Sequence, residues 1–136
     1  MMKRKVILCV CVAAAALFAI GFFVVRGTAK APFYDKGAFA LSKYQEEIEA
    51  SPSDRNVGQI DDAETAVAKA KELWLEKYST VYGQPYDPLN QGAICVAYDE
   101  KAACYHVYCD LPSDTDGVAP NALIKKDGKV SAVWMG

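Results

Sequence analysis

The chain has 136 residues, enough for one small domain and a short additional segment. Its charge is uneven: residues 1–30 hold five basic and no acidic side chains, whereas residues 31–136 hold ten basic and seventeen acidic ones, a net charge of −7. An acidic domain argues against nucleic acid as a ligand and mildly favours a basic partner. The five cysteines and one histidine lack the spacing of a metal site, so neither metal nor cofactor is expected.

The N-terminal segment has the pattern of a membrane anchor. A basic cluster at residues 3–5 precedes twenty uncharged residues, 6–25, the length that a helix needs to cross a bilayer. We therefore expect a cytoplasmic flank at residues 1–5, a single transmembrane anchor at 6–25 and an extracytoplasmic remainder. The alternative is a signal peptide cleaved at residues 29–31. It is disfavoured because a removable apolar segment usually spans about 7–15 residues.

Residues 26–56 are predicted to be a linker that contains one short amphipathic helix. Apolar side chains recur there at helical spacing before a break at residues 51–54, which combine proline with serine and aspartate. The sequence leaves open whether this helix is a spacer or packs on the domain that follows. The apolar positions are Ala38, Leu41, Tyr44 and Ile48.

The most one-sided helical pattern covers residues 61–83. Its apolar side chains recur every three or four positions, opposite a charged face. Asp61 followed by Glu64 has the spacing of an acidic capping box, and Gly83 is typical of the position just past a helix end. A helix with one apolar face requires a partner surface. The apolar stripe consists of Ile60, Ala63, Val67, Ala70, Trp74, Tyr78 and Val81.

Two hairpins are expected to supply that surface. Alternating patterns predict strands at residues 94–98 and 103–109, and a second pair at 118–125 and 129–134. The helix would then cover a curved antiparallel sheet of three to four strands, giving an α+β domain at residues 57–136.

The spacing also predicts how the strands pair. In the first hairpin, Tyr98 would lie opposite Ala103. In the second, a three-residue loop ending at Gly128 would pair Ile124 with Val130. Unbroken alternation beyond this pair keeps Trp134 on the same apolar face. Trp74 and Trp134 would therefore both belong to the core, and whether they fill the interior of the domain stays open.

Several blocks resemble, in the same order, the blocks of one small bacterial family. These blocks are residues 60–66, Tyr82-Gly83, 105–112, Gly117-Val118 and 124–130. The family is the immunity proteins with a nuclear-transport-factor-2-like (cystatin-like) fold, found beside polymorphic toxins. The resemblance covers the predicted domain and not the anchor. It implies the fold of that family and a protein that binds a cognate toxin domain, and it carries over no catalytic residue.

The cysteine and histidine residues are the candidates for catalytic chemistry. Cys104 and His106 lie two apart on one predicted strand, but a nucleophile–base pair needs an orienting third group, and none is identifiable. A plain strand histidine is expected. Cys95 and Cys104 have the same strand parity, so an oxidised pair and two free thiols both stay open. Cys109 is expected to be a buried small residue. The acidic loop at residues 110–116 lacks the ligand pattern of a calcium site.

The sequence therefore predicts a membrane-anchored immunity protein that neutralises a cognate toxin by binding, without catalysis. It would be a single-pass protein of the bacterial cell membrane, held through residues 6–25, with the toxin domain as its partner and no nucleic acid. No partner-binding residue is predicted. One alternative is a small envelope enzyme or ligand-binding protein that uses the cavity of such a fold. A structural envelope protein is another.

Overall fold

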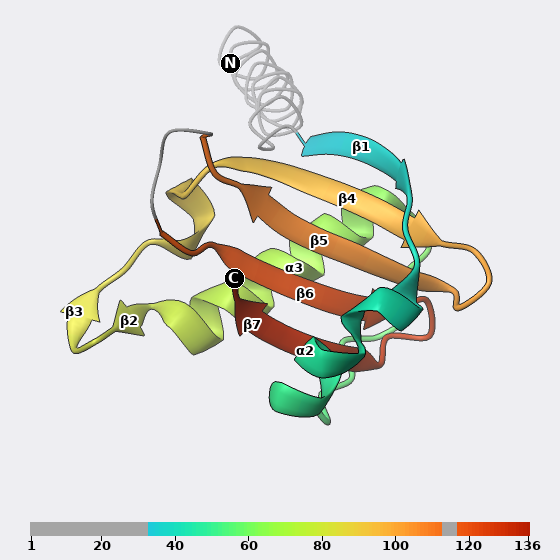
Figure 1. The fold of residues 1–136 in the computed structure, drawn as a ribbon, viewed down its shortest axis with the longest axis horizontal. Helices are drawn as coiled ribbons and strands as arrows, with labels where there is room; N and C mark the ends of the chain where they lie inside the picture. Colours follow the sequence, from blue (N-terminus) through green and yellow to red (C-terminus); the bar gives the residue numbers. More distant parts are fainter. Residues whose placement is uncertain (1–32, 113–116) are drawn as a thin grey trace, which may run out of the picture. The chain divides into compact units, whose positions relative to one another are not determined.

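The computed structural model describes residues 33–112 and 117–136, and Phe33–Gly136 form one compact unit (Figure 1). The predicted anchor lies outside the described residues. Within the described part no helix is long and apolar enough to cross a membrane. The elements in chain order are β1 (Phe33–Ala38), η1 (Leu41–Tyr44), α2 (Gln45–Ala50), α3 (Ala63–Tyr78), β2 (Thr80–Val81), β3 (Gln84–Pro85), η2 (Pro88–Asn90), β4 (Ala93–Asp99), β5 (Cys104–Asp110), β6 (Pro120–Lys125) and β7 (Val130–Met135).

The main sheet has five strands in the order β1-β4-β5-β6-β7, and it is mixed, because β1 runs parallel to β4. The predicted nuclear-transport-factor-2-like sheet of three to four antiparallel strands is therefore wrong. The error lies at residues 33–38, which were assigned to the linker. Phe33 is the only residue of this strand that is partly buried, so β1 is held in the sheet by backbone pairing with β4. Because its side chains are otherwise exposed, the sequence shows no alternating pattern that would predict a strand.

Helix α3 covers one face of the sheet and lies behind it in Figure 1. Trp74 is completely buried in this layer and belongs to one apolar cluster with Val107 and Ile124 of the sheet. The helix begins after Asp62, whose Oδ1 accepts hydrogen bonds from the Thr65 backbone N–H (2.7 Å) and hydroxyl (2.6 Å).

The helix is shorter than the predicted span of residues 61–83, and it ends at Tyr78. The residues after it form a small hairpin, β2–β3, instead of a last helical turn. Its two-residue loop is Tyr82-Gly83, and both residues have positive φ (53° and 77°), the geometry of a tight type I′ hairpin turn.

The second face of the sheet is covered as well, by η1, α2 and Phe39, which lies two residues before η1. The short amphipathic helix therefore packs on the domain, which settles the question that the sequence left open. Asp99 fixes this segment, because its carboxylate accepts the backbone N–H of Leu41 (2.8 Å) and of Ala102 (3.1 Å). These two hydrogen bonds lower the pKa of Asp99. The apolar contacts join Phe39, Leu41, Tyr44 and Ile48 to Cys104, Leu123, Ala132 and Trp134.

A β-bulge divides strand β7 between the two faces. Ile124 pairs with Val130 as predicted, but the next pair is Leu123 with Ala132, so one residue of β7, Ser131, is extra. A one-residue shift turns every following side chain to the opposite face. Trp134 consequently lies on the second face and not beside Val130, and the prediction that it shares the α3 face is wrong.

The β4–β5 hairpin is also shifted from the predicted register. Tyr98 lies opposite Tyr105 and not Ala103, which instead belongs to the turn with a φ of 51°. Cys95 therefore faces Tyr108, four residues along β5 from Cys104. Four residues of strand span about 13 Å, whereas a disulfide requires Cα atoms within about 7 Å. Both thiols are free and buried.

Gly128 occupies a position that no other residue can fill without strain. Its φ is +97°, and an added Cβ would collide with the backbone carbonyl of Gly58. Its own carbonyl accepts a hydrogen bond from Val57 (2.9 Å), so this contact ties the loop before α3 to the β6–β7 turn.

Gly128→Ala should therefore lower the free energy of unfolding by about 3 kcal/mol, the sum of backbone strain and overpacking. Gly83→Ala is the matched control: its φ is +77° but nothing lies within 4 Å, so it should cost only about 1 kcal/mol. Urea unfolding of the full chain, followed by tryptophan fluorescence, measures both. Equal losses in the two variants would contradict the close approach at Gly58.

Candidate functional site

A groove of about 490 Å³ lies on the second face of the sheet, the face that carries α2 in Figure 1. Strands β4 to β7 form its floor, and the segment that carries η1 and α2 forms one wall. We call it the His106 groove. Its lining includes Lys36, Ala38, Phe39, Tyr44, Glu47, Ala97, His106, Tyr108, Asn121, Trp134 and Gly136.

The imidazole of His106 lies inside a cluster of aromatic rings. It stacks on Tyr108, with ring centroids 4.6 Å apart, and on Trp134, with a 12° angle between the ring planes. Tyr44 contacts it from η1 at 4.8 Å. Only 5% of His106 is exposed. The imidazole is therefore part of the groove's floor and is surrounded mainly by aromatic side chains.

Asn121 fixes the tautomer of this histidine, and burial sets its protonation state. The Asn121 amide nitrogen donates to the carbonyl of Ala119 (3.0 Å), so its Oδ1 faces His106 and accepts the Nε2–H at 2.9 Å. Burial lowers the pKa of His106, and the Asn121 hydrogen bond and the negative charge of Glu47 oppose this only in part. The imidazole is neutral at physiological pH.

Cys104 lies on the same face, and it is completely buried. Burial raises the pKa of its thiol to about 12, and the Sγ contacts the backbone carbonyl of Tyr105 at 3.7 Å. A thiolate is the reactive form of cysteine, so a thiol held in this way is inert at neutral pH. Cys109 lies in the α3 layer, where burial raises its pKa to about 11.

Glu47 is a half-buried residue of the groove wall with one shielded carboxylate oxygen. Its Oε2 is shielded from solvent and accepts no hydrogen bond from the described part of the chain. Its charge raises the pKa of Tyr44, although burial of that phenol has the larger effect. Trp74 Nε1 and Tyr86 OH are also buried without a partner, but neither is ionic. A carboxylate oxygen in this state is costly, because burial removes its water and nothing replaces it.

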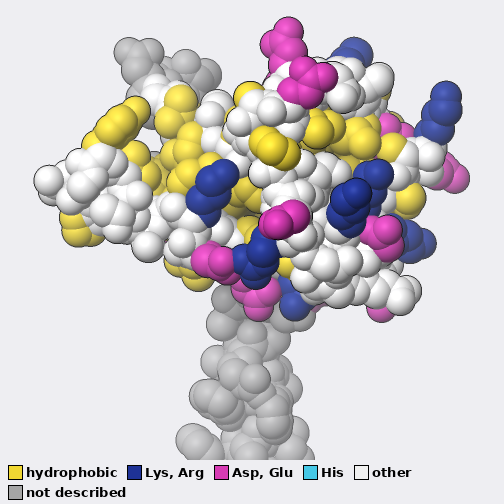
Figure 2. Space-filling view, turned by 90° about the horizontal axis from the view of Figure 1, so that it is seen from below, with side chains coloured by type: hydrophobic (Ala, Val, Ile, Leu, Met, Phe, Trp, Pro, Cys, Tyr) yellow, Lys and Arg dark blue, Asp and Glu magenta, His cyan; other side chains and the backbone are white. Residues whose placement is uncertain are grey.

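A second exposed feature is the arm formed by the β2–β3 hairpin, which projects from the body of the domain in Figure 1. Tyr82 at its tip is 99% exposed. The side of the molecule shown in Figure 2 has basic and acidic groups interspersed, and hydrophobic side chains are exposed between them as well as at the end where the arm lies.

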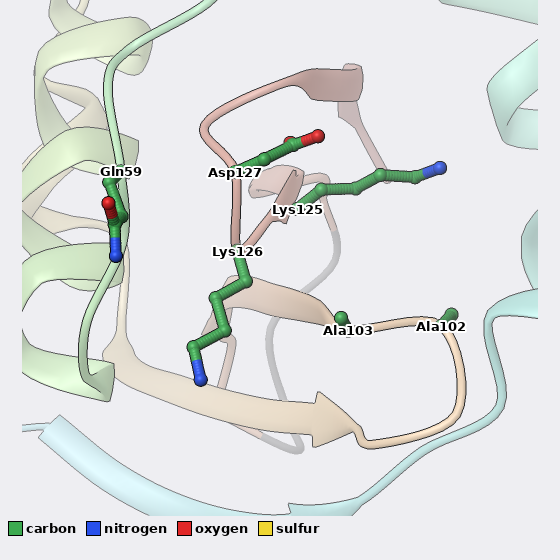
Figure 3. A pocket seen from close by; sticks show the side chains of 6 residues that line it. All are labelled: Gln59, Ala102, Ala103, Lys125, Lys126 and Asp127. Carbon is green, nitrogen blue, oxygen red and sulfur yellow. The ribbon is translucent and has the colours of Figure 1, made fainter.

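A further hollow lies between the β4–β5 and β6–β7 turns (Figure 3). Backbone hydrogen bonds close its base, from Lys126 to Ala103 and from Ile60 to Lys126, each 2.8 Å. Lys125 and Lys126 point in different directions in Figure 3, so their ammonium groups do not converge on one point. This hollow is therefore a gap between turns and not an anion site.

The sequence alone predicted neither the His106 groove nor the β2–β3 arm nor the hollow between the two turns. The pattern predicts Trp134 in the core because the bulge at Ser131 leaves no mark in the residue sequence. The only available signal was the three-residue spacing of Tyr44 and Glu47, which puts both on one helical face. Within residues 33–112 and 117–136, no three potential metal-ligating side chains cluster.

Comparison with known proteins gives this chain no relative: no family model, no curated protein and no solved structure matches it.

The burial of His106 predicts a pH-dependent stability. Its folded pKa is lowered, so as the pH falls through about 6.5 the unfolded chain binds the proton first and folding stability is lost. His106 is the only histidine. The free energy of unfolding should decline between pH 7.5 and 5 in the native protein, with a slope of at most about 1.4 kcal/mol per pH unit. In His106→Gln this decline should be much shallower. Identical slopes in the two proteins would show that the imidazole is not held neutral.

Proposed function

We propose that this protein is a membrane-anchored immunity protein, which neutralises a cognate toxin domain by stoichiometric binding and without catalysis. Support comes first from the sequence: the ordered blocks that resemble the immunity family, and the uncharged segment at residues 6–25 with its basic flank. An anchor in that orientation would hold the domain outside the cell membrane, where a toxin from a neighbouring cell arrives.

The structural observation that carries the proposal is the β2–β3 arm. Tyr82 is fully exposed in a left-handed backbone conformation that costs a non-glycine residue of order 1–2 kcal/mol. Asparagine would fit the first position of this turn far better. The fold gains nothing from a tyrosine there, since the ring contacts solvent alone. Tyrosine is among the residues that dominate binding energy at protein interfaces, so a partner is the natural use of this side chain.

Charge supports the same partner class. Residues 31–136 carry a net charge of −7, which would attract a basic toxin surface and accelerate association.

One observation favours a second candidate, a protein that binds a small ligand. The volume of the His106 groove, about 490 Å³, lies within the usual range for small-molecule sites.

Stoichiometry separates binding from catalysis. Each protein encoded beside this gene is expressed alone to find one that is toxic, and its activity is then titrated with the full chain. Neutralisation by binding predicts that activity falls linearly and reaches zero at one equivalent, independent of incubation time. Time-dependent inactivation by a small fraction of an equivalent would support an enzyme. Absence of any toxic neighbour that this chain neutralises would overturn the proposal.

Tyr82→Asn should separate stability from binding. It creates an Asn-Gly turn, so the free energy of unfolding should rise by about 1 kcal/mol. Loss of the ring should weaken the toxin complex by about 2 kcal/mol, roughly thirtyfold. Tyr34→Asn on β1, another exposed tyrosine, is the control and should leave affinity unchanged. Calorimetric titration measures the affinities. Unchanged affinity in Tyr82→Asn would remove the arm from the interface.

A further inference from the structure

We infer that the His106 groove receives the guanidinium group of an arginine side chain from the partner protein, with Glu47 as its counter-ion and the rings of Tyr44 and Trp134 as its stacking faces. The inference rests on the proposed function for the identity of the partner as a protein.

Glu47 supplies the first argument. Its Oε2 is shielded from water and has no donor within the described residues, so the free protein bears the cost of burying part of a charge. No ion pair joins it to Lys36 or to any other described residue. A donor that arrives with a ligand would satisfy this oxygen. A cationic donor would do so best, because hydrogen bonds between ions are about twice as strong as neutral ones.

The aromatic side chains supply the second argument. The rings of Tyr44 and Trp134 lie 5.9 Å apart at an angle of 44°, and both side chains are only partly buried. Cations bind over tyrosine and tryptophan faces. Arginine fits better than lysine, because its planar group can stack on a ring while its paired N–H donors meet a carboxylate.

The remaining charges of the groove permit a cation. His106 is neutral and its Nε2–H is already donated to Asn121, so it neither repels a guanidinium nor competes for Glu47. Lys36 lines the groove from β1, but its side chain is exposed, so its charge remains hydrated and weakly felt.

The test uses the ¹⁵N-labelled full chain in detergent micelles and follows the two tryptophan indole N–H resonances, which Trp134→Phe assigns. N-acetylarginine amide should shift the Trp134 resonance saturably and leave that of buried Trp74 in place. N-acetylcitrulline amide has the same shape without charge and should bind about tenfold more weakly or worse. The lysine analogue should also bind more weakly than arginine. No shift with arginine, or equal shifts with citrulline, would overturn the inference, and equal binding of lysine would overturn its choice of arginine.

Matched variants locate the counter-ion. Glu47→Gln should weaken binding of the arginine probe about tenfold, whereas Glu46→Gln, which removes the same charge from an exposed neighbour, should not. If the spectrum of Glu47→Gln is not native, Tyr44→Leu serves instead, since it retains apolar packing and removes the ring. Equal binding by Glu47→Gln and Glu46→Gln would overturn the assignment of Glu47.

The two proposals fail separately. If the arginine probe binds as described but no toxin is neutralised, the proposed function is wrong and the groove assignment stands. If a toxin is neutralised equally well by the native chain and by Glu47→Gln, the groove assignment to that partner is wrong and the proposed function stands.

Discussion

Strand β5 is buried on both of its faces, and the rest of the fold follows from that constraint. Tyr105 and Val107 point into the α3 layer, while Cys104 and His106 point to the opposite side. A strand of this kind needs two covering layers, because either face alone would be left against water. Helix α3 provides one layer. Residues 39–48 provide the other, which explains why a segment that precedes the long helix is part of the domain.

The bulge at Ser131 determines what the second layer contains. Without it, Trp134 would continue the α3 face and the second face would lack its largest ring. With it, Trp134 lies beside Asn121 and stacks with His106 across the sheet. The groove thus depends on the one additional residue, Ser131, in the edge strand β7. Bulges commonly redirect side chains in this way, and here the redirected ring completes the floor of the candidate site.

The parts of the fold that could be predicted are those with strong local patterns. Four strands alternate clearly, and the loop ending at Gly128 has the glycine that its geometry requires. Strand β1 could not be predicted because backbone pairing with β4, and not a side-chain pattern, holds it in the sheet. The β4–β5 register escaped prediction because Ala103 enters the left-handed region, where an alanine is not expected. The shielded Glu47 oxygen without a donor among the described residues could not be predicted, because the absence of a donor depends on tertiary packing and not on the local sequence.

Two features of this domain cost stability that the fold itself does not recover. Asp62 and Asp99 show how the chain treats a carboxylate whose role is structural, since each accepts hydrogen bonds from nearby backbone N–H groups. Glu47 and Tyr82 are treated differently: within residues 33–112 and 117–136 one Glu47 oxygen has no donor, and Tyr82 occupies strained backbone at a solvent-exposed hairpin tip. Proteins tend to break local rules of this kind at functional sites. A partner that presents a cation to Glu47 and an apolar surface to Tyr82 would turn both costs into binding free energy.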